Sequence, residues 1–322
     1  MFMNAESEVP VDSRPLLSIV TGTFNEAENI GEFVDRVQSA FVNIPAYRYE
    51  VIVIDNSSTD GTQEVLRKMA AGNPRLKVIL NARNFGHIRS PYHALLQATG
   101  VATLFLASDL QDPPEMIPQF IEKWEGGAKV VAAVKESSDE SAIFFLVRRC
   151  YYMLIERLTD DKVIQNFTGF GLYDRAIIDY CRQIDDPYPY FRGLIAEIGL
   201  PVARIPYRQP LRKRGSTKNN FYTLYDLAIL GITKHSKVPL RLAAMSGFAL
   251  SLLSLLAGLC YLVYKLLFWD RFSAGIAPVV IGLFLFCSVQ LFFIGILGEY
   301  IGLILTHVRK LPLVVEKERI NF

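Results

Sequence analysis

Asp109 and Gln111 are the residues whose types and spacing point most directly to chemistry. They follow residues 102–107, an apolar stretch typical of a buried strand. Carboxylate and amide oxygens are ligands that Mg²⁺ and Mn²⁺ accept, and a cation held there could bridge a diphosphate and stabilise its departure. An aspartate after a strand is also a common turn former or helix cap. The metal interpretation therefore depends on what surrounds the pair.

Further polar residues follow two other apolar runs. Residues 16–24 are succeeded by Asn25 and Glu26, and residues 51–55 end in Asp55, with Asn56 next. Neither GxGxxG nor GxxxxGK[ST] occurs, which excludes the familiar dinucleotide fingerprint and phosphate loop. If the chain binds a diphosphate, it must hold it in another way.

The elements that position these residues alternate between strand and helix patterns. We predict strands at residues 16–24, 51–55, 77–80, 102–107 and 130–134, with amphipathic helices between them. Repeated β-α-β order gives a doubly wound, mostly parallel sheet with helices on both faces. Ligands of such α/β folds bind beyond the carboxyl ends of the strands, where the polar residues lie.

Two long apolar segments follow this domain. Residues 242–267 and 276–305 each approach the roughly 20 residues that a membrane-spanning helix needs, and a short turn joins them. Basic residues flank the pair on both sides, which places both flanks in the cytoplasm. A buried hairpin in a soluble core is the alternative. The basic residues are Lys234, Lys237, Arg241, His307, Arg309, Lys310, Lys317 and Arg319.

The predicted organisation has five parts: a polar N-terminal tail (1–15), a cytoplasmic domain (16–220), a juxtamembrane segment (221–241), two transmembrane helices (242–305) and a cytoplasmic C-terminal tail (306–322). The first residues lack an apolar signal core, so we expect the catalytic domain and both termini in the cytoplasm. The hydrophobic content of 51% agrees with a multi-pass protein of the cytoplasmic membrane.

Composition also excludes some classes. A net charge of +2 and the lack of a basic run with interleaved aromatics give no support for nucleic-acid binding. The four cysteines have no CxxC spacing, so we expect free thiols rather than a disulfide framework or a zinc site.

Several sequence motifs occur in a fixed order along the chain. The first four are SIVTGTFNEAENI, VIVIDNSSTDGT, NFGHIRSPYHALLQATG and LASDLQDPPEMIP. GFGLYDR, FRGL and RKRGSTK follow, and two terminal spans complete the pattern. Together these motifs resemble those of family 2 inverting glycosyltransferases of the GT-A fold, and within them the dolichyl- and undecaprenyl-phosphate glycosyltransferases; the first four are the donor-side motifs of that family. The resemblance covers residues 16 to about 310 and does not specify the sugar.

The resemblance implies a nucleotide-sugar site. Its donor-binding residues would be Gly22, Phe24, Glu26, Asp55, Asn56, Ser108 and Asp109, and Asp109 and Gln111 would hold Mg²⁺ or Mn²⁺. The sequence departs from the family pattern at Ala107, where the first acid of Asp-x-Asp is usual, and at Asn56, where a second acid is usual. Loss of one carboxylate removes a ligand and a negative charge, so the cation would depend more on the donor's phosphates and on water.

Basic residues near the first span suit an anionic acceptor. Arg192, Arg212, Arg214, Ser216 and Lys218 are candidates for binding an acceptor phosphate, and Arg192, Arg214 and Lys218 are also catalytic candidates. A positive-inside flank is the alternative for the basic run. Asp174, in GFGLYDR, is a catalytic candidate that would orient the acceptor, and its alternative is a helix cap.

The predicted reaction moves a sugar from a nucleotide diphosphate, with UDP preferred and GDP open, to undecaprenyl or another polyprenyl phosphate with inversion. Transfer to a glycan or glycolipid is one alternative. A membrane-tethered, catalytically weak sugar-nucleotide binding protein is another, favoured by Ala107 and Asn56. Two spans are few for moving the product across the membrane, so we expect a separate flippase; a homo-oligomer is left open.

Overall fold

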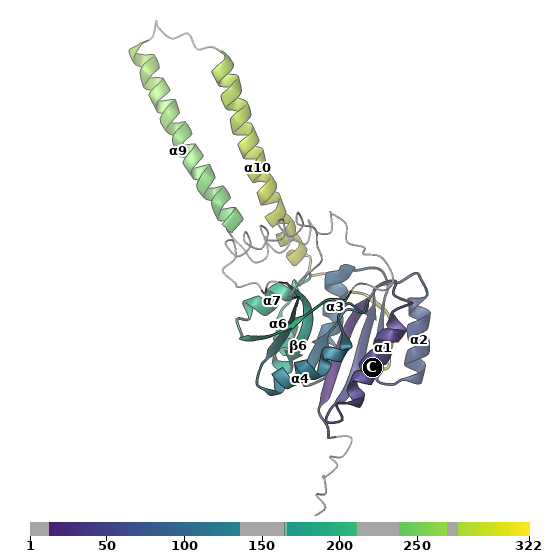
Figure 1. Ribbon diagram of the computed structural model, residues 1–322. Helices are drawn as coiled ribbons and strands as arrows, with labels where there is room; N and C mark the ends of the chain where they lie inside the picture. Colours follow the sequence, from purple (N-terminus) through teal and green to yellow (C-terminus); the bar gives the residue numbers. More distant parts are fainter. Residues whose placement is uncertain (1–12, 136–163, 165, 211–237, 269–275) are drawn as a thin grey trace, which may run out of the picture. The chain divides into compact units, whose positions relative to one another are not determined.

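The computed structural model describes residues 13–135, 164, 166–210, 238–268 and 276–322 (Figure 1). The chain divides into two compact units. Within the described ranges, the first contains residues up to 210 together with 310–322, and the second contains residues 238–268 and 276–309. The end of the chain is thus part of the first unit.

The first unit is built on an 8-stranded sheet with the order β7-β5-β6-β4-β1-β2-β3-β8. β6 and β8 run antiparallel to their neighbours, whereas the other strands are parallel to one another. The strands are β1 Leu16–Thr23, β2 Arg48–Asp55, β3 Leu76–Asn81, β4 Ala102–Phe105, β5 Val130–Lys135, β6 Phe167–Asp174, β7 Val202–Tyr207 and β8 Glu316–Ile320.

Helices cover both faces of this sheet. α1 (Ile30–Val42), α2 (Thr62–Gly72) and α4 (Ile117–Glu125) share one apolar core with the sheet, and the short helix η1 (Pro114–Met116) precedes α4. α3 (Gly86–Leu96), α6 (Arg175–Gln183) and α7 (Phe191–Glu197) share a second core on the opposite face. The predicted doubly wound, mostly parallel architecture is confirmed.

Register aligns the carboxyl ends of the central strands. Thr23 of β1 pairs with Asp55 of β2, and Asp55 pairs with Leu80 of β3. β1 and β2 are almost continuously apolar and buried because helices cover both sides of a parallel sheet. The polar loops that follow them must therefore gather at one edge.

β6, β7 and β8 were not predicted, and β8 corrects the expected tail at residues 306–322. β8 pairs antiparallel with β3, with Ile320 opposite Val78 and Glu318 opposite Leu80. Its sequence, EKERI, is charged and short, which is common for an edge strand and hard to distinguish from a solvated tail.

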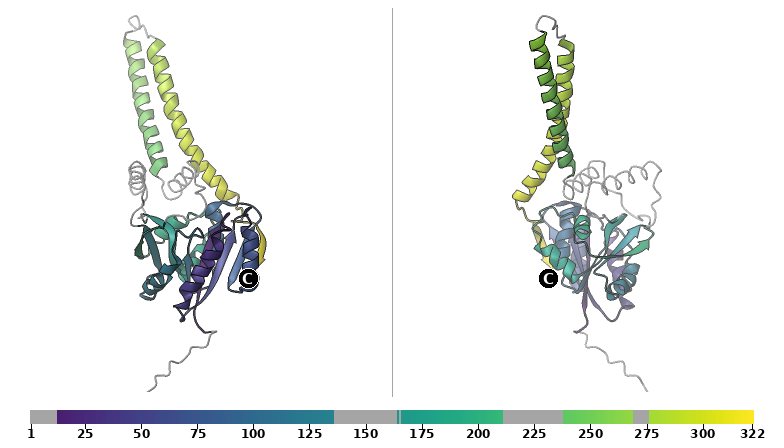
Figure 2. Two further views of the ribbon diagram at one scale, coloured as in Figure 1. Left: turned by 45° about the vertical axis from the view of Figure 1, so that its right-hand side comes forward. Right: turned by 90° about the vertical axis from the view of Figure 1, so that its left-hand side faces the viewer.

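α9 (Val238–Leu267) and α10 (Ile276–Val308) make up most of the described part of the second unit, and they run side by side (Figures 1 and 2). By length and composition, Leu242–Cys260 and Gly282–Val308 are candidate membrane spans. Their apolar side chains are largely exposed within the unit, with Phe248 at 78% and Phe284 at 71%. This exposure argues against the alternative of a buried soluble hairpin.

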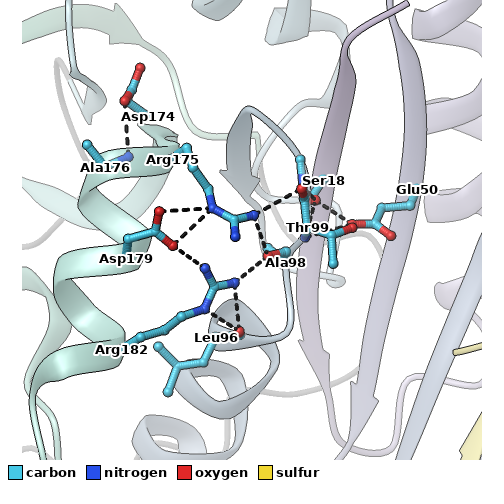
Figure 3. Close-up of polar contacts among 11 residues, drawn as sticks. Ser18, Glu50, Leu96, Ala98, Thr99, Asp174, Arg175, Ala176, Asp179 and Arg182 are labelled. Atoms are coloured by element: carbon cyan, nitrogen blue, oxygen red, sulfur yellow. Dashed lines mark hydrogen bonds and ion pairs between the residues drawn. The ribbon is translucent and has the colours of Figure 1, made fainter. Parts of the chain in front are cut away.

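The buried side chain of Glu50 bonds to several segments at the amino edge of the sheet (Figure 3). Glu50 of β2 accepts hydrogen bonds from the Ser18 hydroxyl, the Thr99 amide (3.0 Å) and the Thr99 hydroxyl (2.8 Å), and it forms an ion pair with Lys77 at 2.7 Å. Burial alone would raise the pKa of Glu50, but these partners outweigh it and hold the pKa below its ordinary value of 4.5.

We therefore expect Glu50→Gln to destabilise the first unit by about 1–3 kcal/mol at neutral pH. Because the folded-state pKa is depressed, the carboxylate's contribution is complete above the ordinary value of 4.5 and disappears as the pH falls through the folded-state pKa. Urea unfolding followed by Trp124 fluorescence at several pH values measures this difference. Glu64→Gln, which removes an exposed ion pair with Arg67, is the control. A wild-type-minus-variant difference independent of pH would contradict the assignment.

Candidate active site at the carboxyl edge of the sheet

The loops after β1 and β2 interlock. The Asn25 amide donates to the Ser58 hydroxyl at 2.8 Å, and the Asn25 side-chain oxygen accepts from the Thr59 amide at 2.8 Å. The Glu26 amide donates to the Thr62 hydroxyl at 3.1 Å. These reciprocal bonds fix two loops that lie far apart in the sequence as one rigid surface.

Asp55 stabilises the loop after β2 from within the protein. Its side chain is fully buried and accepts from the Ser58 amide at 2.9 Å, the Ser58 hydroxyl and the Gln63 side chain at 2.8 Å. Glu26, also buried, accepts from the Asn29 side chain. The structure thus assigns both carboxylates to holding the loops, and their predicted contact with a donor stays a prediction.

Gly22 lets the carboxyl end of β1 approach α3 closely. A Cβ there would lie 2.7 Å from Cγ of Pro91, so a larger residue would displace this contact. The Gly22 carbonyl also accepts from the Ser108 hydroxyl at 3.1 Å. Ser108 belongs to the metal-motif loop, residues 106–112. Phe24 begins the first loop, directly after β1 at the same edge. Gly22 and Ser108 are thus in contact, and the predicted role of Gly22, Phe24 and Ser108 in binding a donor stays a prediction.

The metal-motif loop alternates between inward and outward residues. Ser108, Leu110 and Asp112 are buried, whereas Ala107, Asp109 and Gln111 are partly exposed. Leu110 has a φ of +62°, a left-handed conformation that is costly for a large side chain. The Gln111 amide donates to Asp109 Oδ1 at 3.1 Å. The two predicted ligands are thus both partly exposed, and Ala107 has no side-chain oxygen that could join them.

Asp112 was missed by the sequence reasoning, although it is an acid inside the LASDLQDPPEMIP motif. Its carboxylate accepts from the Ala107 amide at 3.0 Å and from the Tyr207 hydroxyl at 3.1 Å, so it turns back into the protein. Burial raises the pKa of Asp112 to about 6. Asp112 therefore shapes the loop and does not replace the carboxylate missing at Ala107.

The available oxygen ligands suit a metal ion that the protein shares with a bound diphosphate. Across the described ranges, no group of three or more His, Cys, Asp or Glu side chains could enclose a metal ion. Asp109 and Gln111 offer two oxygen ligands within one loop, whereas Mg²⁺ usually keeps several ligands from phosphates and water. Such a site suits a cation that a bound diphosphate helps to hold.

The Asn56 side chain holds residues 81–86 through four hydrogen bonds. Its Nδ2 donates to Asn84 Oδ1 at 2.8 Å and to the Gly86 carbonyl at 3.2 Å, while its Oδ1 accepts from the Phe85 amide at 2.8 Å and from Asn81 Nδ2 at 3.3 Å. An aspartate could not make the two donations. The departure from the family pattern at Asn56 thus has a structural reason, and the role of Asn56 is to hold residues 81–86.

Backbone strain is concentrated at the same edge. Asn25 (φ +57°), Ser57 (φ +65°) and Leu110 (φ +62°) adopt left-handed conformations in the loops after β1, β2 and β4. Non-glycine residues pay for such conformations, which often accompany functional sites.

Arg192, at the start of α7, lies at this edge too. Its guanidinium donates to the carbonyl of Phe167 at 3.2 Å and lies over the Tyr190 ring. Phe167 begins the antiparallel strand β6, so it lies near the carboxyl ends of the parallel strands. Desolvation by surrounding protein and the nearby charge of Arg192 both lower the pKa of His87. Arg212, Arg214, Ser216 and Lys218 lie outside the described residues.

The structure corrects the role predicted for Asp174. Asp174 ends β6 opposite Ala102, the first residue of β4, so it lies at the amino edge of the sheet. Its side chain caps α6 by accepting from the Ala176 amide at 3.1 Å, as Figure 3 shows, and it accepts from Trp124 at 2.8 Å and Lys129 at 3.0 Å. The helix-cap alternative explains these contacts, and Asp174 is removed from the candidate site.

Comparisons with known proteins show the family of the chain. The sequence model described as Glycosyl transferase family 2 matches residues 18–181. An uncharacterized glycosyltransferase of Bacillus subtilis, YkcC, is 31% identical over 300 residues, which cover 92% of each chain. The SfII prophage-derived bactoprenol glucosyl transferase of Shigella flexneri is 30% identical over 305 residues, covering 94% of this chain and 97% of the relative.

A solved mannosyltransferase of Pyrobaculum calidifontis, in complex with GDP-Man and Mn²⁺, is 18% identical, with a TM-score of 0.45 over 93% of this chain and 88% of that one.

The matched family model and the curated relatives establish the assignment: this chain belongs to glycosyl transferase family 2. It is a glycosyltransferase, and the matched residues 18–181 lie in the range of the α/β first unit.

The role of Asn56 predicts that restoring the usual acid damages the enzyme. Asn56→Asp places a carboxylate oxygen against two acceptors, Asn84 Oδ1 and the Gly86 carbonyl, so the loop should shift. We expect donor affinity to fall by about tenfold or more, as for an unsatisfied buried polar contact. Titration of the purified protein with UDP or GDP measures this change. Tighter binding in the variant would instead support a ligand role for an acid at this position.

The corrected role of Asp174 predicts a loss of stability without a loss of chemistry. Asp174→Ala removes a helix cap and should cost about 1–2 kcal/mol of stability. Turnover per folded molecule should stay within about twofold of the wild type, because a twofold change corresponds to only about 0.4 kcal/mol in the barrier. Turnover measured below the melting temperature tests this expectation, and a large fall with unchanged folding would return Asp174 to the site.

Proposed function

We propose that this protein transfers a sugar from a nucleoside diphosphate to a polyprenyl phosphate at a membrane surface, with inversion at the anomeric carbon. The observation that carries the proposal is the full-length similarity to a bactoprenol glucosyl transferase, which extends through the candidate spans to 94% of this chain. Family membership supports the glycosyl transfer, and the carboxyl-edge loops supply a site for the donor.

In this proposal, the donor diphosphate lies beside the metal-motif loop. Asp109 and Gln111 would hold Mg²⁺ or Mn²⁺ together with the donor phosphates, and the cation would neutralise charge on the leaving diphosphate. The Ser108–Gly22 bond and the Asp112–Ala107 bond keep the loop rigid while the donor binds. The base and ribose would then lie against the first loop, near Gly22 and Phe24. UDP is the preferred carrier, and GDP is the alternative.

The acceptor needs positioning more than deprotonation. A phosphate monoester with a second pKa near about 6 is largely dianionic at neutral pH, so its oxygen can attack without a strong base. That oxygen bonds to the anomeric carbon, the bond from this carbon to the leaving diphosphate breaks, and the configuration inverts. Arg192 would attract the phosphate at the carboxyl edge, and Arg212, Arg214, Ser216 and Lys218 are proposed to complete this site. Arg214 and Lys218 are proposed to balance charge during attack.

We propose that α9 and α10 cross the cytoplasmic membrane with the catalytic domain on the cytoplasmic side. Their length, their apolar composition and the basic residues at both flanks support this topology. A polyprenyl acceptor lies in the same bilayer, which explains why a soluble GT-A domain would carry such helices. A separate flippase would move the product, and self-association is left as a question for experiment.

The test is incubation of the full-length protein in detergent with undecaprenyl phosphate, Mg²⁺ or Mn²⁺, and a panel of UDP- and GDP-sugars, followed by mass spectrometry of the lipid. We expect a lipid monophosphate sugar that forms only with metal. Asp109→Ala should reduce its formation by at least about 10²-fold, as when a group that stabilises transition-state charge is lost, and should leave the melting temperature nearly unchanged.

The two alternatives give different results in the same assay. An enzyme that acts directly on a glycan or glycolipid would release nucleotide only when such an acceptor is added. A binding protein, which Ala107 makes conceivable, would bind donor without consuming it under any condition. Wild-type activity in Asp109→Ala would remove the metal assignment.

A further inference from the structure

The segment before β8, together with its first residue, contacts the loop that Asn56 organises. The Ala82 amide donates to the Val315 carbonyl at 2.9 Å, and the Arg89 guanidinium donates to the Pro312 carbonyl. His93 of α3 pairs with Glu316 at 2.6 Å. Residues 312–316, here called the return segment, therefore lie against the start of the β3–α3 loop, residues 82–85, and against α3 itself.

Packing reinforces these polar contacts. Val314 is buried, and Leu313 packs against the apolar core that contains Tyr92, Ala94 and Leu95 of α3. An irregularity in the pairing at Leu80 and Asn81 interrupts the regular alternation of β8. Glu316 consequently reaches His93 of α3, whereas Glu318 reaches Arg67 of α2 at 2.8 Å. A single strand thus holds helices on both faces of the sheet.

The β3–α3 loop is held between two partners. Asn56 bonds to Asn84, Phe85 and Gly86, whereas the return segment bonds to Ala82 of the loop and to Arg89 of the following helix α3. Both Arg83 and Arg89 lie over the ring of Phe85, at 4.2 and 5.4 Å from its centroid. The loop that borders the carboxyl edge therefore depends on residues more than 220 positions later in the chain.

We propose that the return segment is a positioning element of the donor site and that Glu316 is its principal positioning residue. The inference rests on the proposed function, because it assumes that the β3–α3 loop borders a bound nucleotide. Glu316 does not touch the donor. It acts through His93, which fixes α3, and Arg319 orients the Glu316 carboxylate through two hydrogen bonds of 2.8 and 2.6 Å.

The chain supplies a matched control. Glu316→Ala and Glu318→Ala each remove one ion-paired glutamate from β8, but the first frees α3 beside the site and the second frees α2. Both should lower the melting temperature to a similar, small extent. Only Glu316→Ala should raise the donor KM and the Kd for UDP or GDP alone, by about three- to tenfold, as expected when a binding loop loses its support. Its kcat should stay within about twofold.

Hydrogen exchange adds a readout that does not depend on turnover. Glu316→Ala should speed exchange in residues 81–93, whereas Glu318→Ala should not, and Glu316→Gln, which keeps a hydrogen-bonding group, should restore most of the nucleotide affinity. Equal effects of the two alanine variants on Kd, or no effect of either, would overturn the positioning role. Wild-type protein that binds nucleotide but makes no lipid-linked sugar would instead refute the proposed function and leave this inference standing.

Discussion

The alignment of parallel strand ends is the constraint on which the rest of the site depends. Because Thr23 pairs with Asp55 and Asp55 with Leu80, the loops after β1, β2 and β3 must emerge side by side. Each loop then uses side chains to hold the next: Asn25 with Ser58, Asn56 with residues 84–86, and Ser108 with Gly22. Much of the polar chemistry in these loops makes the surface rigid. Asp109 and Gln111 are among the polar residues of these loops that remain partly exposed.

Because many of these polar side chains hold the loops together, the two departures from the family pattern have different consequences. Asn56 is part of an amide network in which a carboxylate could not donate, so its presence does not by itself indicate a weakened enzyme. Ala107 is different, because alanine has no oxygen with which to hold a cation beside Asp109 and Gln111. If these two residues hold a cation, as we propose, the donor's phosphates would complete its coordination.

The sequence was sufficient to predict those elements and residues that follow from apolar periodicity and from position at a strand end. The first five strands, the doubly wound order, and the approach of the loop containing Ser108 to the end of β1 at Gly22 could all be predicted from apolar runs and the residues after them. β8 could not, because a short charged strand owes its conformation to pairing with β3. Asp174 was misplaced for a similar reason: β6 runs antiparallel, so the end of this strand lies at the opposite edge. Asp112 and Asn56 needed the three-dimensional contacts to show what they hold.

The most direct test of this account is hydrogen exchange of the full-length protein with and without UDP or GDP and Mn²⁺, because it locates the donor site without assuming an acceptor. The account predicts slower exchange in residues 22–27, 56–62, 82–89 and 107–112, with residues 174–182 unchanged. Protection concentrated around residues 174–182, at the amino edge of the sheet, would contradict it.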